Sequence, residues 1–177
     1  MQLPVVIPAA GKGTRLRPLT EDKPKALVEV DQKPLLSHCF EAVPDQYVSE
    51  FIVITGYEGG QIEEYYGDEH GGVPITYTAQ TEPRGLADAV LTTESHVDGP
   101  FLVLNGDNVL RGDLAQLVQS HVRNESAATL LVEDVSRETA KTRGVVIFDD
   151  NGEMTGYVEK PEDPPSTRAS AGVFAFD

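Results

Sequence analysis

Residues 8–25 read Pro8-Ala-Ala-Gly-Lys-Gly-Thr-Arg-Leu-Arg-Pro-Leu-Thr-Glu-Asp-Lys-Pro-Lys25 and follow a short apolar run. Gly11 and Gly13 let the backbone approach a ligand closely and point amide N–H groups at an anion. Five of the 14 Lys and Arg residues lie between Lys12 and Lys25. In a chain with a net charge of −15, this concentration of cations predicts a strongly anionic ligand such as a triphosphate.

The sequence excludes the two best-known phosphate-binding loop motifs. A P-loop requires Gly-x-x-x-x-Gly-Lys-Ser/Thr, which this segment lacks, and the dinucleotide fingerprint requires a third glycine where this chain has Leu16. The segment therefore binds phosphate by another scheme. The alternative is a flexible loop whose cations pair with nearby carboxylates.

The composition of the chain limits its partners and its compartment. Its 29 Asp and Glu residues argue against nucleic acid, because phosphate backbones require clustered cations. Such a charge suits either a salt-adapted protein or an ordinary acidic cytosolic enzyme, since high salt screens the self-repulsion. Cys39 is the only cysteine, which excludes an intrachain disulfide. The run Leu3–Ile7 is too short for a signal peptide or a membrane span, so we expect a cytoplasmic enzyme with no membrane partner.

Short apolar runs alternate with segments of helical periodicity. The runs predict four buried strands, at Leu3–Ile7, Phe51–Ile54, Ile75–Ala79 and Phe101–Leu104. Helices are predicted around Leu35–Val43, Ile62–Tyr66, Leu86–Val97 and Leu114–Val122, the last capped by Asp113. This alternation favours an α/β fold with a mainly parallel central sheet and helices on both faces.

The pattern changes after residue 127. Ala127–Val132 and Ala171–Phe176 each predict a strand, and Val145–Phe148 and Thr155–Val158 flank the hairpin turn signal Asn151-Gly152. We therefore expect added hairpin strands within one domain spanning residues 1–177. Because the sequence stops directly after the last strand, a domain truncated at its C-terminal end is an equal expectation.

Polar residues follow two of the other predicted strands as well. Asp107 comes just after Phe101–Leu104, where a carboxylate can hold Mg²⁺ together with phosphate oxygens; the alternative is an Asx turn that ends the strand. Gln80 follows Ile75–Ala79, and Gly85 opens the next helix, which is also compatible with an ordinary helix start. Ligands of open α/β sheets bind beyond the carboxyl ends of the strands. We therefore expect one shared edge to collect Gly11, Arg15, Lys25, Gln80, Gly85 and Asp107.

Several motifs together resemble one family. Gly11-x-Gly13-Thr14-Arg15-Leu16-x-Pro18, Lys23-Pro24-Lys25, Gly106-Asp107-Asn108 and Val158-Glu159-Lys160-Pro161 are similar to the signature of sugar-1-phosphate nucleotidyltransferases. Glucose-1-phosphate thymidylyl- and uridylyltransferases match best. The resemblance implies a Rossmann-like nucleotidyltransferase fold of the GT-A type. It also implies transfer of a pyrimidine nucleotide from dTTP or UTP to a sugar-1-phosphate, with glucose-1-phosphate the expected acceptor and pyrophosphate released.

The resemblance also implies roles for individual residues. Arg15 would contact the triphosphate and the departing pyrophosphate, Lys25 would bridge the reacting phosphates, and Asp107 would bind Mg²⁺. The nucleotide would further contact Ala10, Gly11, Gly13, Thr14, Gln80 and Gly85, of which Gln80 and Gly85 would read the pyrimidine edge. Asn108, Gly144 and Glu159 would contact the sugar, and Lys160 would hold its phosphate.

Two alternatives to this function remain open. The first is a different sugar or base, for example N-acetylglucosamine-1-phosphate or GTP. The second is a non-catalytic regulatory or nucleotide-sensing relative, against which the retained Arg15, Lys25, Asp107, Glu159 and Lys160 argue. Members of the family usually carry a second metal-binding Asp downstream, for which this sequence shows no counterpart. A homo-oligomer is compatible with the sequence.

Overall fold

The computed structural model describes the whole chain except residues 57, 83, 111–113 and 125. The chain divides into two compact units. The first comprises Met1–Thr129 and Phe174–Asp177, and the second comprises Leu130–Val173. The assignment of residues 1–177 to a single domain stays a prediction.

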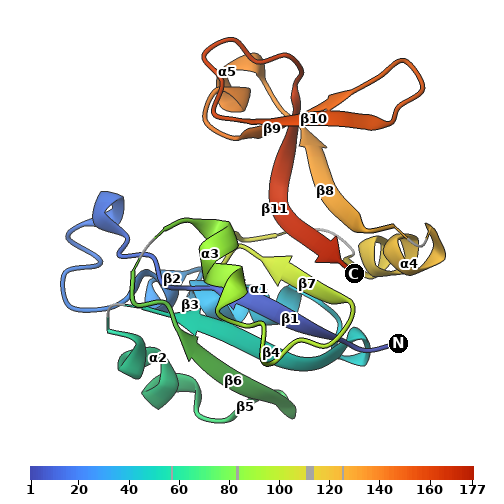
Figure 1. The fold of residues 1–177 in the computed structure, drawn as a ribbon. Helices are drawn as coiled ribbons and strands as arrows, with labels where there is room; N and C mark the ends of the chain where they lie inside the picture. The colour runs from blue at the N-terminus through green and yellow to red at the C-terminus, as the bar shows by residue number, and fades with distance from the viewer. Residues whose placement is uncertain (57, 83, 111–113, 125) are drawn as a thin grey trace. The chain divides into compact units, whose positions relative to one another are not determined.

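The first unit is built on a mainly parallel sheet (Figure 1). Strand β1 pairs in parallel with β4 and β7, and β4 pairs in parallel with β6. A short strand, β5, is antiparallel to β6, and the end of β11 lies beside β7. The strands are β1 (Leu3–Pro8), β4 (Val48–Thr55), β5 (Glu69–His70), β6 (Val73–Ala79), β7 (Phe101–Leu104) and β11 (Arg168–Phe176).

Helices cover both faces of this sheet. Successive side chains of a strand point to opposite faces, so apolar residues of β4 pack against helices on either side. On one face, Phe51 of β4 contacts Phe40 of α1 (Leu35–Ala42), with ring centroids 4.5 Å apart. On the other face, Ile52 and Ile54 of β4 join a buried cluster with Ala89 of α3 (Leu86–Leu91). The predicted α/β fold with helices on both faces is confirmed.

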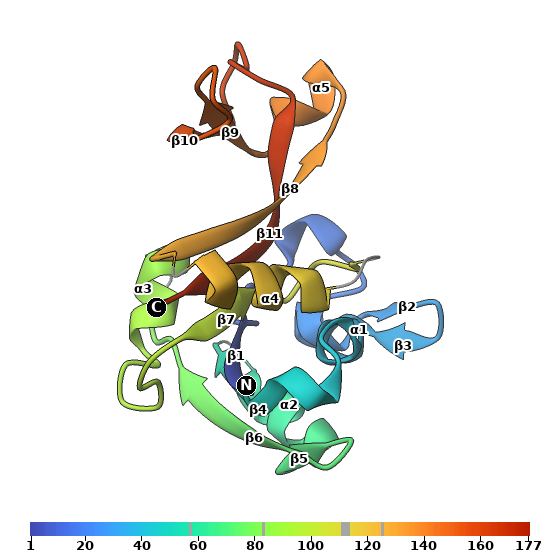
Figure 2. The same ribbon diagram turned by 90° about the vertical axis from the view of Figure 1, so that its right-hand side faces the viewer.

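The remaining elements of the first unit lie around this sheet (Figure 2). They are α2 (Gly59–Tyr66), α4 (Leu114–Asn124) and the two-stranded β2 (Glu29–Val30) and β3 (Lys33–Pro34). Two sequence-based details are wrong. The helix expected to reach Val97 ends at Leu91, although Val97 still packs against the cluster. Val122, which the helical spacing of apolar residues from Leu114 places on the buried face of α4, is 45% exposed. Asp113, the expected cap of α4, lies outside the described residues.

The second unit is a small antiparallel arrangement with one short helix. Strand β9 (Gly144–Phe148) pairs with β10 (Met154–Glu159) and with the start of β11. Gly152 between β9 and β10 has a φ of 83°, a backbone conformation that favours glycine. The unit also contains most of β8 (Ala128–Asp134) and α5 (Arg137–Ala140). The expected hairpin strands are therefore confirmed.

The described residues form no helix with the length and apolar character needed to cross a membrane.

Candidate active site

The loop after β1 is shaped by one glycine. Gly13 has a φ of 60° and precedes a short 3₁₀ helix, Thr14–Leu16, and its carbonyl accepts a 2.8 Å hydrogen bond from the Thr20 hydroxyl. A Cβ at position 13 would lie 2.9 Å from the Cβ of Lys25. Both the backbone conformation and the lack of space therefore require glycine, and the loop folds back against Lys25.

Lys25 and Asp107 are brought together by the fold. Lys25 begins a second 3₁₀ helix, Lys25–Leu27, and its Nζ lies 2.5 Å from Oδ2 of Asp107. The Lys25 side chain is 26% exposed and the Asp107 side chain is 50% exposed, so a ligand can reach both groups. The lysine expected to bind phosphate and the candidate metal ligand therefore lie side by side.

The loop that carries Asp107 is fixed from two sides. The Gly106 amide donates to the Pro8 carbonyl at 3.3 Å, and a Cβ at Gly106 would lie 2.6 Å from that oxygen. From beneath, the buried Cys39 thiol of α1 contacts the carbonyls of Asn105 and Asn108, each at 3.7 Å. Burial, with a smaller contribution from the Asp107 charge, raises the pKa of Cys39 to about 12. Cys39 thus contacts residues on either side of Asp107. The sequence pattern places Cys39 on the apolar face of a helix and does not predict this contact.

Gln80 and Gly85 form a second cluster in the first unit, at the end of β6. The Gln80 backbone amide donates to the Thr55 carbonyl at 2.8 Å, which ties the end of β6 to the end of β4. The Gln80 side-chain amide donates to Asp88 Oδ2 at 2.8 Å and to the Gly85 carbonyl at 3.4 Å. Gly85, with a φ of 110°, precedes α3. Sequence reasoning missed Asp88, whose contact with Gln80 joins two different elements.

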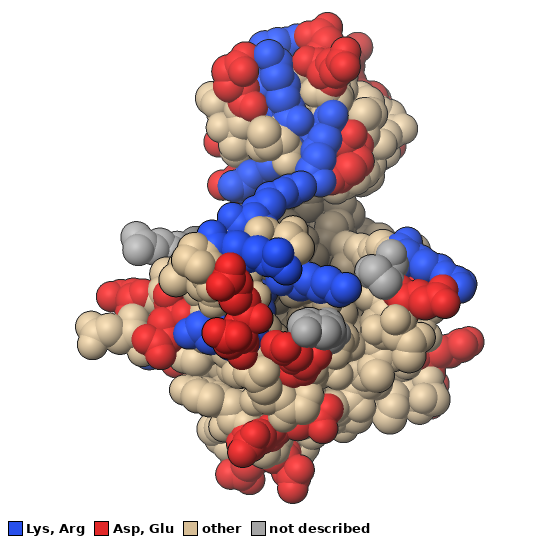
Figure 3. Space-filling view, turned by 90° about the vertical axis from the view of Figure 1, so that its left-hand side faces the viewer, with Lys and Arg blue, Asp and Glu red and all other residues tan. Residues whose placement is uncertain are grey.

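The clusters lie at the same edge of the sheet. Because β7, β1, β4 and β6 are parallel neighbours, the loops after β1, β6 and β7 all leave from the strands' carboxyl ends. Gly11 and Arg15 lie exposed in the first of these loops. On the face of the first unit drawn in Figure 3, Lys and Arg side chains gather toward one end, and Asp and Glu side chains are spread over the remainder.

The candidate sugar-binding residues Gly144, Glu159 and Lys160 meet in the second unit. Glu159 lies opposite Gly144 across β9 and β10, and its Oε1 is 3.0 Å from Lys160 Nζ. The Tyr157 hydroxyl donates to Glu159 Oε2 at 3.3 Å. A Cβ at Gly144 would lie only 1.7 Å from the Tyr157 hydroxyl oxygen. Gly144 therefore leaves room for Tyr157, a residue that sequence reasoning also missed.

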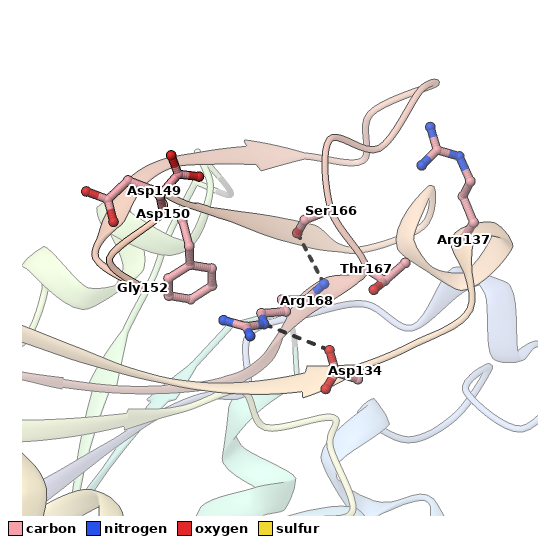
Figure 4. Close-up of a pocket in the computed structure, with 9 residues that line it drawn as sticks. Asp134, Arg137, Asp149, Asp150, Gly152, Ser166, Thr167 and Arg168 are labelled. Atoms are coloured by element: carbon pink, nitrogen blue, oxygen red, sulfur yellow. Dashed lines mark hydrogen bonds and ion pairs between the residues drawn. The ribbon is translucent and has the colours of Figure 1, made fainter.

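A separate cavity of about 600 Å³ in the second unit contains none of the predicted site residues (Figure 4). The Arg168 guanidinium lies 4.7 Å from the centre of the Phe148 ring and 4.0 Å from Asp134. Arg137, which also lines the cavity, forms an ion pair with Asp163. The cationic groups of Arg137 and Arg168 thus already have acidic partners within the second unit.

The residues at Asp107 suit a metal ion that arrives with a phosphate ligand. Within the described part of the chain, no group of three or more His, Cys, Asp or Glu residues could hold a metal ion by itself. Mg²⁺ commonly uses one or two protein carboxylates and completes its coordination with substrate phosphates and water. The half-exposed Asp107 carboxylate beside Lys25 fits that donor set.

Comparison with known proteins identifies relatives over nearly the whole chain. The chain is 47% identical to the UTP–glucose-1-phosphate uridylyltransferase AglF of Haloferax volcanii, covering 97% of this chain and 70% of that protein. It is 37% identical to a glucose-1-phosphate thymidylyltransferase of Streptomyces antibioticus, covering 95% of this chain and 48% of the relative. A solved structure of UDP-glucose pyrophosphorylase with UDP-glucose superimposes with a TM-score of 0.88 at 26% identity, covering 99% of this chain and 76% of that structure.

The chain thus spans 70% of one of these relatives and about half of the other. Residues 4–177 match the family described as nucleotidyl transferase. The chain therefore belongs to the nucleotidyl transferase family and, as its motifs predict, to the sugar-1-phosphate nucleotidyltransferases within it.

Proposed function

We propose that the chain joins a pyrimidine nucleoside triphosphate to a sugar-1-phosphate, giving a nucleotide sugar and pyrophosphate. The observation that carries this proposal is the 2.5 Å contact between Lys25 and Asp107 at the end of the loop rich in cations. Both substrates are anions, so the reaction requires cations that hold them together against their repulsion.

The proposed chemistry is an in-line displacement at the α-phosphorus. An oxygen of the sugar phosphate forms a bond to that phosphorus, while the bond to the bridging oxygen of the β-phosphate breaks and its electron pair leaves with pyrophosphate. The attacking oxygen is already ionised near neutral pH, so no general base is required. Catalysis then depends on positioning and on charge neutralisation, as in other phosphoryl-type transfers.

The residues of the first loop would hold the triphosphate. The amides of Ala10, Gly11, Gly13 and Thr14 would face the phosphates, and Arg15 would neutralise the charge that develops on pyrophosphate. Mg²⁺ bound by Asp107 would supply a further positive charge to the reacting phosphates. Lys25, released from its contact with Asp107, would lie between the two substrates.

The choice of substrates rests on the relatives and on the second unit. The similar proteins carry the names of a UTP–glucose-1-phosphate uridylyltransferase and a glucose-1-phosphate thymidylyltransferase, which favours UTP or dTTP and glucose-1-phosphate. We propose that Asn108, Gly144 and Glu159 contact the sugar and that Lys160 holds its phosphate. The contact between Glu159 and Lys160 supports this assignment, because one carboxylate and one ammonium suit a molecule with hydroxyls and a phosphate.

The cellular setting is proposed from the charge of the chain. A net charge of −15 is best tolerated where salt screens it, so we propose a salt-adapted cytoplasmic enzyme. Neither nucleic acid nor a membrane is expected as a partner, and a homo-oligomer is compatible with this proposal.

The test is pyrophosphate release with Mg²⁺ from UTP, dTTP, CTP, GTP and ATP, each combined with several sugar phosphates. We expect the fastest release from UTP or dTTP with glucose-1-phosphate. Faster release from GTP, or with N-acetylglucosamine-1-phosphate, would reassign the substrates within the family. No release from any pair would favour a regulatory, non-catalytic role.

A further inference from the structure

The side chain of Gln80 is held in one orientation by acceptors on one side. Its Nε2 donates to a carboxylate oxygen of Asp88 at 2.8 Å and to the Gly85 carbonyl at 3.4 Å. A Gln side chain has an amide nitrogen that only donates and an oxygen that only accepts. Because both neighbours on this side are acceptors, the nitrogen must face them and Oε1 must face away.

Asp88 holds this arrangement more firmly than Gly85 can. It lies in the first turn of α3 and is half-buried, as Gln80 is. A hydrogen bond to an ionised acceptor is stronger than one to a neutral acceptor, and the Asp88 contact is also the shorter of the two. An ionised carboxylate cannot donate, so a rotation of the Gln80 amide by half a turn would place two acceptors against each other.

A small cavity of about 260 Å³ lies beside this pair. Gln80 and Asp88 both line it, together with Glu82 and Thr92. If a nucleotide base lies against Gln80, the side-chain oxygen of Gln80 faces the base as a hydrogen-bond acceptor with a fixed direction. A ring N–H at the position that faces Gln80 can donate to that oxygen directly, whereas a bare ring nitrogen there would place two acceptors against each other. An amino group beside that nitrogen could reach the oxygen only if the ring shifted out of this position.

We infer that Asp88 determines base specificity by orienting Gln80, so that the site selects bases with a ring N–H and rejects those with a bare ring nitrogen. This inference rests on the proposed function, in which Gln80 faces the base. Uracil, thymine and guanine carry a ring N–H at their pairing edge, whereas cytosine and adenine present an unprotonated nitrogen there. Discrimination between pyrimidines and guanine must then come from other contacts, such as the space available to the ring.

The expected size of the effect follows from unpaired polar groups. A site built to accept a hydrogen bond from a substrate N–H rejects an analogue that lacks it, because two acceptors then remain unsatisfied. We expect UTP to bind at least about tenfold more tightly than CTP. Replacing Asp88 by Asn supplies a side chain that can either donate or accept, so Gln80 can turn and most of this preference is lost.

The test compares the dissociation constants for UTP and CTP, measured by calorimetry with Mg²⁺, in the wild type and in Asp88→Asn. The dissociation constant for CTP divided by that for UTP should fall about tenfold in Asp88→Asn, mainly because CTP binds more tightly. Glu82→Gln is the matched control, because it removes one negative charge from the same cavity without touching a described contact of Gln80. Its ratio should equal that of the wild type. Asp88→Ser provides a second variant if Asp88→Asn melts at a clearly lower temperature.

The outcomes separate this inference from the proposed function. An unchanged ratio in Asp88→Asn and Asp88→Ser, with a lowered ratio in Gln80→Ala, overturns the role of Asp88 alone. An unchanged ratio in Gln80→Ala overturns the inference by removing Gln80 from the base. If the wild type binds UTP selectively but releases no pyrophosphate with any sugar phosphate, the proposed function fails. The ratios of dissociation constants then still test whether Asp88 determines the preference for UTP over CTP.

Discussion

Lys25 and Asp107 are 82 residues apart in the sequence, yet their side chains meet at 2.5 Å at the carboxyl edge of a parallel sheet. The contact depends on the parallel pairing of β1 with β7, which places the loop after each strand at the same edge. It also places the Lys25 ammonium against the Asp107 carboxylate, the candidate ligand for Mg²⁺. The proposed transfer of a nucleotide to a sugar-1-phosphate depends on this pair.

Gly13 should be the glycine of the first loop that tolerates substitution least. A side chain there must adopt a φ of 60° and would lie 2.9 Å from both the Cβ of Lys25 and the Cγ2 of Thr20. We expect Gly13→Ala to lower the free energy of unfolding by about 1–3 kcal/mol, measured by urea denaturation. Gly11→Ala is the control, because nothing lies within 4 Å of its Cβ position. Equal losses in the two variants would contradict the close packing of Gly13 against Lys25.

The protein should lose stability in alkaline solution. Burial raises the pKa of the Cys39 thiol to about 12 from 9.0 and raises the pKa of Tyr66 to about 12 from 10.0. An acid whose pKa is raised in the folded state ionises first in the unfolded chain, so its contribution is intact below about pH 9 and is lost toward pH 12. Melting temperatures measured from pH 8 to 11 should fall, and the fall should be smaller in Tyr66→Phe. A flat profile would contradict the burial of these groups.

Tyr157 should affect the sugar phosphate and not the nucleotide. In the structure it donates to Glu159 Oε2, while Lys160 holds Oε1 of the same carboxylate. If a sugar phosphate draws Lys160 away, Tyr157 is the contact that still orients Glu159. We expect Tyr157→Phe to raise the KM for the sugar phosphate by about threefold to tenfold, with kcat and the nucleotide KM nearly unchanged.

The control for that variant is Tyr77→Phe. It removes a hydroxyl that donates to the Gly67 carbonyl at 2.8 Å in the first unit. Tyr77→Phe should leave both KM values at the wild-type level. An effect of Tyr157→Phe on the nucleotide KM alone would contradict the sugar assignment of Glu159.

Salt should stabilise the folded protein. The chain carries a net charge of −15, and the repulsion between its carboxylates weakens as the screening length shortens. Melting temperature measured in rising concentrations of KCl should therefore increase. A temperature that stays flat or falls would count against salt adaptation and favour an ordinary acidic enzyme.

The sequence predicted the parts of the fold that depend on local pattern. The four apolar runs became β1, β4, β6 and β7. The runs in β1, β4 and β7 are almost wholly buried, and the run in β6 is buried at Ile75 and half-buried from Thr76 to Thr78. The Asn151-Gly152 turn likewise predicted the pairing of β9 with β10. The end of α3 at Leu91 was not predicted, because Val97 continues the apolar pattern of the helix. Val97 lies beyond the helix and is apolar because it packs against the core.

The candidate site was predicted less completely than the fold. The cations and glycines of the first loop stand together in the sequence, so their concentration was visible without a structure. Cys39, Asp88 and Tyr157 gave no such signal. The contacts of Cys39 with Asn105 and of Asp88 with Gln80 arise only when separate elements pack together. Tyr157 and Glu159 lie two residues apart on β10, but a single tyrosine near a glutamate is too common in sequences to indicate a binding site.

The most direct test of the central claim is pyrophosphate release by Asp107→Asn and Lys25→Ala, with UTP or dTTP, glucose-1-phosphate and Mg²⁺. Lys33→Ala is the matched control, because Lys33 is also an exposed lysine in an ion pair, with Glu41. We expect turnover to fall by about 10²-fold or more in the first two variants and to stay near wild type in the third. Release near the wild-type rate from Asp107→Asn or Lys25→Ala would contradict the account.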